Sequence, residues 1–233
     1  MRLAKFLANA GVASRRAAER FIAAKRVSVN GQFVFDPALD VSENDTVTVD
    51  GVRIEAGDRG ELIYLMLHKP EGVVSTMQIG REKGFCLSDL VQIERRVHPV
   101  GRLDRDSSGL ILLTNDGNLT YRLIHPRYKV EKEYLVKLQK PLQIQQIDRL
   151  MKGVAIDGSK VEIDAFRPAA GGRISLTIHE GRKRILRRLF AEIGNKVLEL
   201  KRVRIGNLRL GRLGRGRWRY LKDAEIDALK KLL

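Results

Sequence analysis

The sequence predicts an α+β protein built from two domains. Expected strands and helices mix along the chain, without the strict alternation of a doubly wound sheet. A length of 233 residues is enough for two domains. Residues 51–61 contain three glycines and no apolar run, which indicates the end of the first domain followed by a linker. We therefore expect domains at residues 1–58 and 59–233.

The first domain is expected to open with two short helices and to continue as strands. Leu3, Phe6 and Leu7 follow helical spacing, Gly11 can end the first helix, and Ser14 can cap the second. An Asn-Gly turn at residues 30–31 predicts a hairpin after Val27, and a strand at residues 46–49 meets a second turn at residues 50–51.

The second domain is expected to hold a mixed set of strands and helices. A continuous apolar strand at residues 61–68 is stopped by Lys69-Pro70, and residues 110–113 form another buried strand. Further along the chain we expect a helix after Asn118, a strand at 134–138, a helix at 141–153, strands at 161–166 and 174–178, a helix at 183–193, a strand at 197–203 and a final helix at 223–232.

The charge of the chain favours a polyanionic partner. Lys and Arg number 44 against 28 Asp and Glu, which gives a net charge of +16. Cationic side chains displace counterions from phosphate backbones and so gain affinity for nucleic acid. The alternative is a merely basic surface, but the charge is uneven, and one cluster of basic residues lies within the first 26 residues. Its members are Arg2, Lys5, Arg15, Arg16, Arg20, Lys25 and Arg26.

Several classes of protein are disfavoured by the composition. A single cysteine, Cys86, provides no disulfide framework and fits a reducing compartment. The four histidines are widely spaced, so no metal site is expected. We find no signal peptide after Met1, and no apolar run approaches the roughly 20 residues that cross a membrane. We expect a cytoplasmic protein.

The most informative stretch is residues 101–117, GRLDRDSSGLILLTNDG. Asp104 sits between two arginines, Arg102 and Arg105, where a charged loop leads into a buried strand, and functional carboxylates are often presented on such loops. Without a second acid, Cys or His cluster nearby, this indicates an enzyme that uses one aspartate. The alternative is a structural ion pair with either arginine. Arg102 can either hold an RNA phosphate or brace the loop. We give Asp106 little weight as a second acid.

Four segments together resemble the ordered motifs of pseudouridine synthases. They are HKPEGVVST (68–76), GRLD (101–104), KVEKEYLVKL (129–138) and EGRKRILRRLF (180–190). Residues 2–31 resemble the alpha-L RNA-binding module first named from a small-subunit ribosomal protein. The chain is most similar to the group that modifies ribosomal RNA. The resemblance implies a small alpha-L domain followed by a larger domain with a mixed, mostly antiparallel sheet.

The resemblance also implies the chemistry. The family's catalytic aspartate maps onto Asp104, its cationic partner onto Arg187 and its active-site tyrosine onto Tyr134. The aspartate acts either as a nucleophile or as a base, and a neighbouring cation favours its ionised form. The tyrosine holds the base that has left its stack. Ile185 departs from the family, in which this position is commonly Gln or Glu, and an isoleucine side chain cannot make the hydrogen bond that a polar side chain would make there.

The resemblance implies that the substrate is ribosomal RNA. The sequence is slightly more similar to the enzymes that modify large-subunit RNA than to the one that modifies small-subunit RNA. Transfer RNA is an alternative substrate. No cofactor or metal is implied, and a monomer is expected. Arg102 and four basic residues near residue 185 are interpreted as RNA contacts, and Arg187 is not among them. The four are Arg182, Lys183, Arg184 and Arg188.

Two rival functions remain at this stage. A non-catalytic RNA-binding or ribosome-assembly protein explains the charge and the N-terminal module, but not the presence of Asp104, Tyr134 and Arg187 together. A nucleoside or glycoside hydrolase would release free uracil, whereas isomerisation retains the base.

Overall fold

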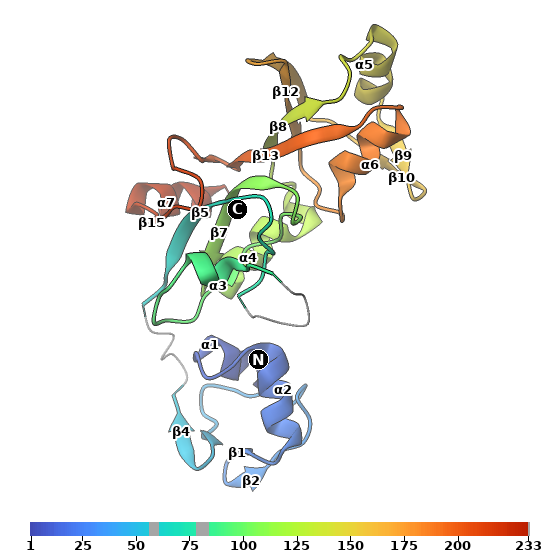
Figure 1. Ribbon diagram of the computed structural model, residues 1–233. Helices are drawn as coiled ribbons and strands as arrows, with labels where there is room; N and C mark the ends of the chain where they lie inside the picture. The colour runs from blue at the N-terminus through green and yellow to red at the C-terminus, as the bar shows by residue number, and fades with distance from the viewer. Residues whose placement is uncertain (56–60, 78–83, 233) are drawn as a thin grey trace. The chain divides into compact units, whose positions relative to one another are not determined.

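Figure 1 shows a computed structural model of the chain, which describes residues 1–55, 61–77 and 84–232. The chain divides into two compact units, Met1–Leu62 and Ile63–Leu233. The boundary expected between residues 58 and 59 falls within 56–60, outside the described residues.

The first unit packs a helix pair with a small sheet. Its elements are α1 (Leu3–Asn9), α2 (Arg15–Ala23), β1 (Val27–Val29), β2 (Gln32–Phe33), β3 (Val47–Val49) and β4 (Val52–Ile54), with strand order β2-β1-β3-β4. Ser14 caps α2 as predicted, because its Oγ accepts a hydrogen bond from the Ala17 amide at 3.1 Å. Leu3, Leu7 and Ile22 are fully buried between the elements. Residues 52–54 pair with β3, so the first domain continues at least to the end of β4.

The second unit is organised by one large sheet. Its main strand order is β11-β12-β8-β13-β7-β5-β15, with β14 paired to β13 and β6 to β7. The strands are β5 (Tyr64–Lys69), β6 (His98–Pro99), β7 (Ser108–Thr114), β8 (Lys132–Leu138), β11 (Ala165–Ala169), β12 (Arg173–Ile178), β13 (Val197–Ile205), β14 (Leu208–Arg209) and β15 (Trp218–Tyr220). Every pair is antiparallel except β13 with β7. The expected mixed, mostly antiparallel sheet is confirmed.

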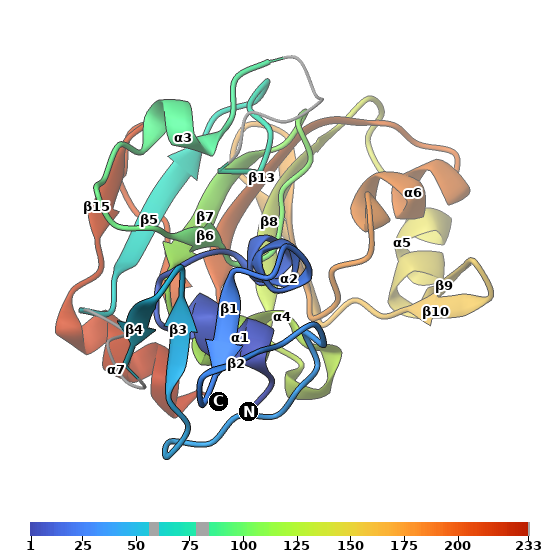
Figure 2. The ribbon, with the colours of Figure 1, turned by 90° about the horizontal axis from the view of Figure 1, so that it is seen from below.

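Helices and a small hairpin complete this unit. They are α3 (Leu87–Leu90), α4 (Gly117–Ile124), a short 3₁₀ helix (Pro126–Tyr128), α5 (Ile144–Met151), the hairpin β9 (Val154–Ile156) with β10 (Ser159–Val161), α6 (Ile185–Glu192) and α7 (Asp223–Lys231). Figures 1 and 2 show α5, α6 and the hairpin gathered in one cluster. Within the part of the chain that the structure describes, no helix is both long enough and apolar enough to cross a membrane.

Both faces of the central strands are buried. Leu65 and Leu67 of β5 enter one hydrophobic cluster, which also contains residues of α6, whereas Met66 enters the cluster that contains residues of α4 and α7. A strand covered on both faces has apolar residues at every position rather than at alternate ones. This explains why β5 and β7 stand out in the sequence as continuous apolar runs.

The prediction of one continuous strand at residues 161–166 is wrong. Residues 161–166 do not form a single strand, because β10 ends at Val161 and β11 begins at Ala165 in a different sheet. The break is held at Asp164, whose amide donates to the Thr177 carbonyl at 2.9 Å and whose carboxylate lies 2.8 Å from Nδ1 of His179.

Candidate active site

A cavity of about 490 Å³ lies in the second unit. Its lining comes from the loop that precedes β7, from β8 and β13, and from the turn that leads into α6. Asp104, Tyr134 and Ile185 all line it. Segments that are far apart in the sequence therefore converge on one site.

The loop that carries Asp104 is fixed on both sides of this residue. The Ser75 hydroxyl donates to the Leu103 carbonyl at 2.7 Å and lies 3.0 Å from the Leu103 amide, which donates to it. The Gly72 amide donates to the Arg105 carbonyl at 2.7 Å. Because these contacts come from residues 72–75, the segment after β5 supports the loop. The Asp104 side chain itself is half-buried.

Neither of the two neighbouring arginines forms the alternative ion pair with Asp104. Arg105 turns away and donates through Nε to the Gly72 carbonyl at 3.1 Å. Arg102 is exposed and lines the cavity. Among the described residues, no cation lies within ion-pair distance of the Asp104 carboxylate. Its carboxylate is therefore left open to the cavity.

Arg187 is bound to Asp106 rather than to Asp104. Its Nη2 donates to the Asp106 carbonyl at 2.6 Å and its Nη1 to the Val197 carbonyl at 3.0 Å. Its Nε lies 3.3 Å from Oδ2 of Asp106, without the alignment of a hydrogen bond. Arg187 thus ties α6 and β13 to the loop, two residues beyond Asp104.

Asp106 has a structural importance that the sequence reasoning missed. Its carboxylate accepts from Nη1 and Nη2 of Arg184 at 3.0 and 2.9 Å. Burial raises the pKa of Asp106, but the hydrogen bond from Arg184 and the charges of Arg187 and Arg184 outweigh it, so the pKa lies below its usual value. The guanidinium of Arg184 binds this carboxylate through two parallel hydrogen bonds. No sequence pattern indicates the contact, because Arg184 and Asp106 lie 78 residues apart in the chain.

Asp106→Asn is expected to lower kcat by about 10- to 100-fold, because a displacement of about 1 Å in a reacting group costs up to that much. The substitution keeps the shape of the side chain and removes the charge that holds Arg184 and Arg187. KM is expected to change little. Single-turnover and steady-state rates on RNA provide the measurement. Glu192→Gln, which alters an exposed acid of α6 that pairs with Arg149, is the control. A kcat equal to that of the control would contradict the assigned role.

Lys69 is fully buried beneath this loop. Its Nζ donates to the carbonyls of Pro70 and Val73 at 2.9 and 2.7 Å. Burial lowers the pKa of Lys69 to about 8, against the opposing effect of Glu71, Asp106 and Asp104. Lys69 therefore places a buried cation against residues 70–73, the segment that supports the Asp104 loop.

Tyr134 forms a buried wall of the cavity. It lies on β8 opposite Arg202 of β13 and Leu176 of β12, and only 8% of its surface is exposed. Ile185, at 5% exposure, adds an aliphatic surface at the start of α6. This side chain belongs to the hydrophobic core and offers no hydrogen-bonding group to the cavity.

Comparisons with known proteins assign the chain to a family. Residues 63–192 match the family model described as RNA pseudouridylate synthase, and residues 1–47 match that of the S4 domain. This chain belongs to the RNA pseudouridylate synthase family. It is 37% identical to the ribosomal large subunit pseudouridine synthase B of Bacillus subtilis (strain 168), over 99% of this chain and 96% of that one.

Further relatives of this pseudouridine synthase agree. The dual-specificity RNA pseudouridine synthase RluF of Escherichia coli (strain K12) is 36% identical, over 100% of this chain and 79% of that one. A crystal structure of a pseudouridylate synthase superimposes with a TM-score of 0.71 at 30% identity, over 98% of this chain and 99% of that one. The resemblances drawn from the four motifs and from the N-terminal module are confirmed.

The basic residues of the synthase differ in how freely they can meet RNA. All seven predicted N-terminal contacts are exposed, although Arg26 is paired with Asp50 and stacks on the Phe21 ring. Near α6, Arg182 is bound to Glu180, Arg184 to Asp106, and Arg188 to Asp157. Lys183 and Arg102 are exposed and have no ion-pair partner among the described residues.

Proposed function

We propose that this pseudouridine synthase isomerises a specific uridine of ribosomal RNA, with large-subunit RNA favoured over small-subunit RNA. One observation carries the proposal. Among the described residues that line the cavity, Asp104 is the single acid, and six cations and Tyr134 share the wall with it. The relatives include a ribosomal large subunit pseudouridine synthase, which supports the choice of RNA.

Asp104 is proposed to carry the chemistry. Isomerisation breaks the bond between N1 of uracil and C1′ of ribose, retains the base, and joins C5 to C1′. An ionised carboxylate can attack C1′ or the ring as a nucleophile, or take a ribose proton as a base. A carboxylate without an ion-pair partner, held between two anchored neighbours, is free to do either. Arg187 then acts as a positioning residue, through Asp106.

Tyr134 is proposed to hold the flipped base. An enzyme that acts on a base must take it out of its stack and into a pocket. A base stacked on an aromatic ring gains roughly 1–3 kcal/mol. The burial of Tyr134 among strands gives a rigid surface for this contact.

The RNA backbone is proposed to contact the exposed cations of the S4 domain, together with Arg102 and Lys183 beside the cavity. We also propose that the enzyme works in the cytoplasm as a monomer, without metal or cofactor. Arg182, Arg184 and Arg188 keep exposed edges, so they can add charge to the RNA surface while their acidic partners hold them.

Tritium release tests this function. Large-subunit RNA, small-subunit RNA and transfer RNA are transcribed with tritium at C5 of uridine and incubated with the purified protein. Isomerisation replaces the C5–H bond with a C5–C1′ bond, so tritium enters water. We expect release from large-subunit RNA. Tritium release from transfer RNA alone would show that transfer RNA is the substrate. Free uracil would indicate a hydrolase. RNA binding without tritium release would indicate a non-catalytic protein.

The S4 domain is expected to set the salt dependence of binding. Replacing Lys5, Arg15, Arg16 and Arg20 by glutamine should lower the slope of log K against log salt by about 0.7–0.9 for each phosphate that these cations neutralise. Filter binding between low and moderate salt measures this slope. Arg53→Gln, an exposed cation on β4 outside the helix pair, is the control. An unaltered slope in the fourfold variant would show that the helices do not contact phosphate.

A further inference from the structure

Arg202 is a buried cation whose charge is left unpaired. It lies on β13 with 3% of its surface exposed. Its Nε donates to the Leu110 carbonyl at 2.8 Å, while Nη2 is buried without a hydrogen-bond partner in the described part of the chain. No carboxylate among those residues lies within ion-pair distance of it. An unsatisfied buried cation is costly, so a fold that retains one points to a partner that arrives from outside.

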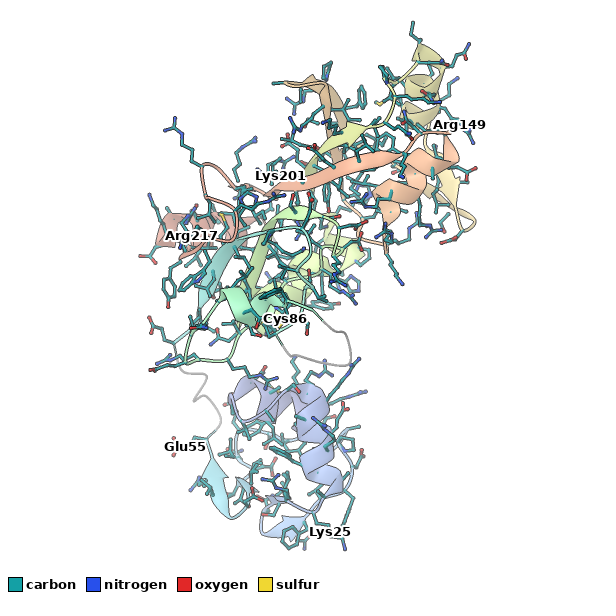
Figure 3. The ribbon with its side chains drawn as sticks, viewed as in Figure 1. Lys25, Glu55, Cys86, Arg149, Lys201 and Arg217 are labelled. Carbon is teal, nitrogen blue, oxygen red and sulfur yellow. The ribbon has the colours of Figure 1, made fainter. Side chains whose placement is uncertain are left out.

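The sheet fixes Arg202 beside the proposed base-holding ring. Arg202 pairs in register with Tyr134 on β8 and with Gly109 on β7. Residues directly opposite each other on neighbouring strands present their side chains to the same face. Both Arg202 and Tyr134 line the cavity. Figure 3 labels the preceding residue, Lys201, on the same strand.

The close approach of β7 depends on Gly109. A Cβ atom at this position would lie 2.1 Å from the Arg202 carbonyl oxygen. Only glycine therefore lets β7 approach near enough for the Leu110 carbonyl to hold Nε of Arg202. The hydrogen bond fixes Nε, and Nη2 is the buried nitrogen of the guanidinium that has no hydrogen-bond partner among the described residues.

Five of the six described cations that line the cavity fall into two groups by burial, and the sixth, Arg182, is half-buried and bound to Glu180. Arg102, Lys183 and Arg184 are exposed and suit the phosphates, which stay on the RNA backbone. Arg202 and Lys132 are more deeply placed, where a flipped base would enter. Lys132 is already satisfied, because its Nζ donates to the Val130 and His179 carbonyls at 2.8 and 3.2 Å. Among the described residues, Nη2 of Arg202 still lacks a hydrogen-bond partner.

We propose that Arg202 binds the uracil itself, by donating to a carbonyl oxygen of the base and stabilising the negative charge that the base carries once it is detached. This inference rests on the proposed function. When the N1–C1′ bond breaks, its electron pair stays on the base and spreads over N1, O2 and O4. The base turns, C5 bonds to C1′, the C5 proton leaves, and N1 takes up a proton. Nothing is oxidised or reduced.

A cation that is already positioned to stabilise the charge that develops in the transition state contributes strongly to the reaction rate. Loss of one such donor typically costs about 10²–10³ in rate. We expect a loss of that size for Arg202→Met in single turnovers at saturating enzyme on a transcribed large-subunit RNA fragment that spans the modified uridine. Arg202→Lys keeps the charge and is expected to recover part of the rate. Arg167→Met, at an exposed position of β11, is the matched control.

A second RNA separates base stabilisation from a structural effect. The same fragment is transcribed with 5-fluorouridine, whose fluorine withdraws electrons and makes the base a better leaving group. The disappearance of the target 5-fluorouridine reports cleavage of the N1–C1′ bond. This base needs less stabilisation by a cation. The fold-reduction in rate caused by Arg202→Met should therefore be at least tenfold smaller on the 5-fluorouridine RNA than on the uridine RNA. Equal losses on both RNAs would overturn the proposal.

Wild-type protein and Asp104→Asn are run in the same assay. Activity in the wild type that is lost in Asp104→Asn upholds the proposed function, whatever Arg202→Met does. If that pattern holds and Arg202→Met loses equal rate on both RNAs, the role of Arg202 alone is wrong. If the wild type leaves both RNAs unchanged, the proposed function fails, and the role of Arg202 fails with it.

Discussion

Asp104→Asn is expected to abolish pseudouridine formation while RNA binding and the fold remain intact. Loss of a carboxylate that acts as nucleophile or base removes about 10²–10⁴ in rate. Asparagine has the same shape, and among the described residues the Asp104 carboxylate has no ion pair to lose. The free energy of unfolding should therefore change by no more than about 0.5 kcal/mol, as for surface substitutions that break no special feature.

Rates of tritium release, filter binding and urea unfolding measure these three properties of Asp104→Asn. Asp148→Asn, at an exposed position of α5, is the matched control. A rate within tenfold of the wild type would show that another group carries the chemistry. Loss of binding together with activity would show instead that Asp104 acts in recognition.

Gly109→Ala is expected to have the largest effect on stability. The added Cβ would meet the Arg202 carbonyl oxygen at 2.1 Å and the Arg202 amide nitrogen at 2.5 Å. The φ angle of Gly109 is +111°, which alanine rarely adopts. Overpacking costs about 1–3 kcal/mol and backbone strain a similar amount, so a loss of about 2–6 kcal/mol is expected.

Urea unfolding followed by the fluorescence of Trp218, the only tryptophan in the chain, measures this loss. Gly117→Ala is the matched control, because nothing lies within 4 Å of its added Cβ and its φ is not positive. Gly117 begins α4, where alanine should stabilise slightly. Equal unfolding free energies for the two variants would mean that β7 and β13 do not approach as closely as the structure has them.

The elements with strong local signals were predictable from the sequence. Ser14 marks the start of α2, and the apolar runs of β5 and β7 indicate strands that are buried on both faces. The division into β10 and β11 was not predictable in this way, because an apolar pattern at residues 161–166 does not reveal that the chain changes sheets at Asp164.

The site was predictable in part. The resemblance placed Asp104, Tyr134 and Arg187 in one domain, and Asp104 and Tyr134 do line one cavity. The contact between Arg187 and Asp106 depends on side-chain directions at the end of a loop, and no sequence pattern specifies them. Arg202 stood out no more than the other cations of residues 201–219, because its burial depends on Gly109, far away in the sequence.

Pseudouridine mapping of ribosomal RNA tests the central claim most directly. RNA is compared from cells with the gene, cells without it, and cells without it that carry either the wild-type gene or Asp104→Asn. One pseudouridine of large-subunit RNA should be missing without the gene, return with the wild type and stay missing with Asp104→Asn. An unchanged map in cells without the gene, or recovery of the site by Asp104→Asn, would contradict the claim.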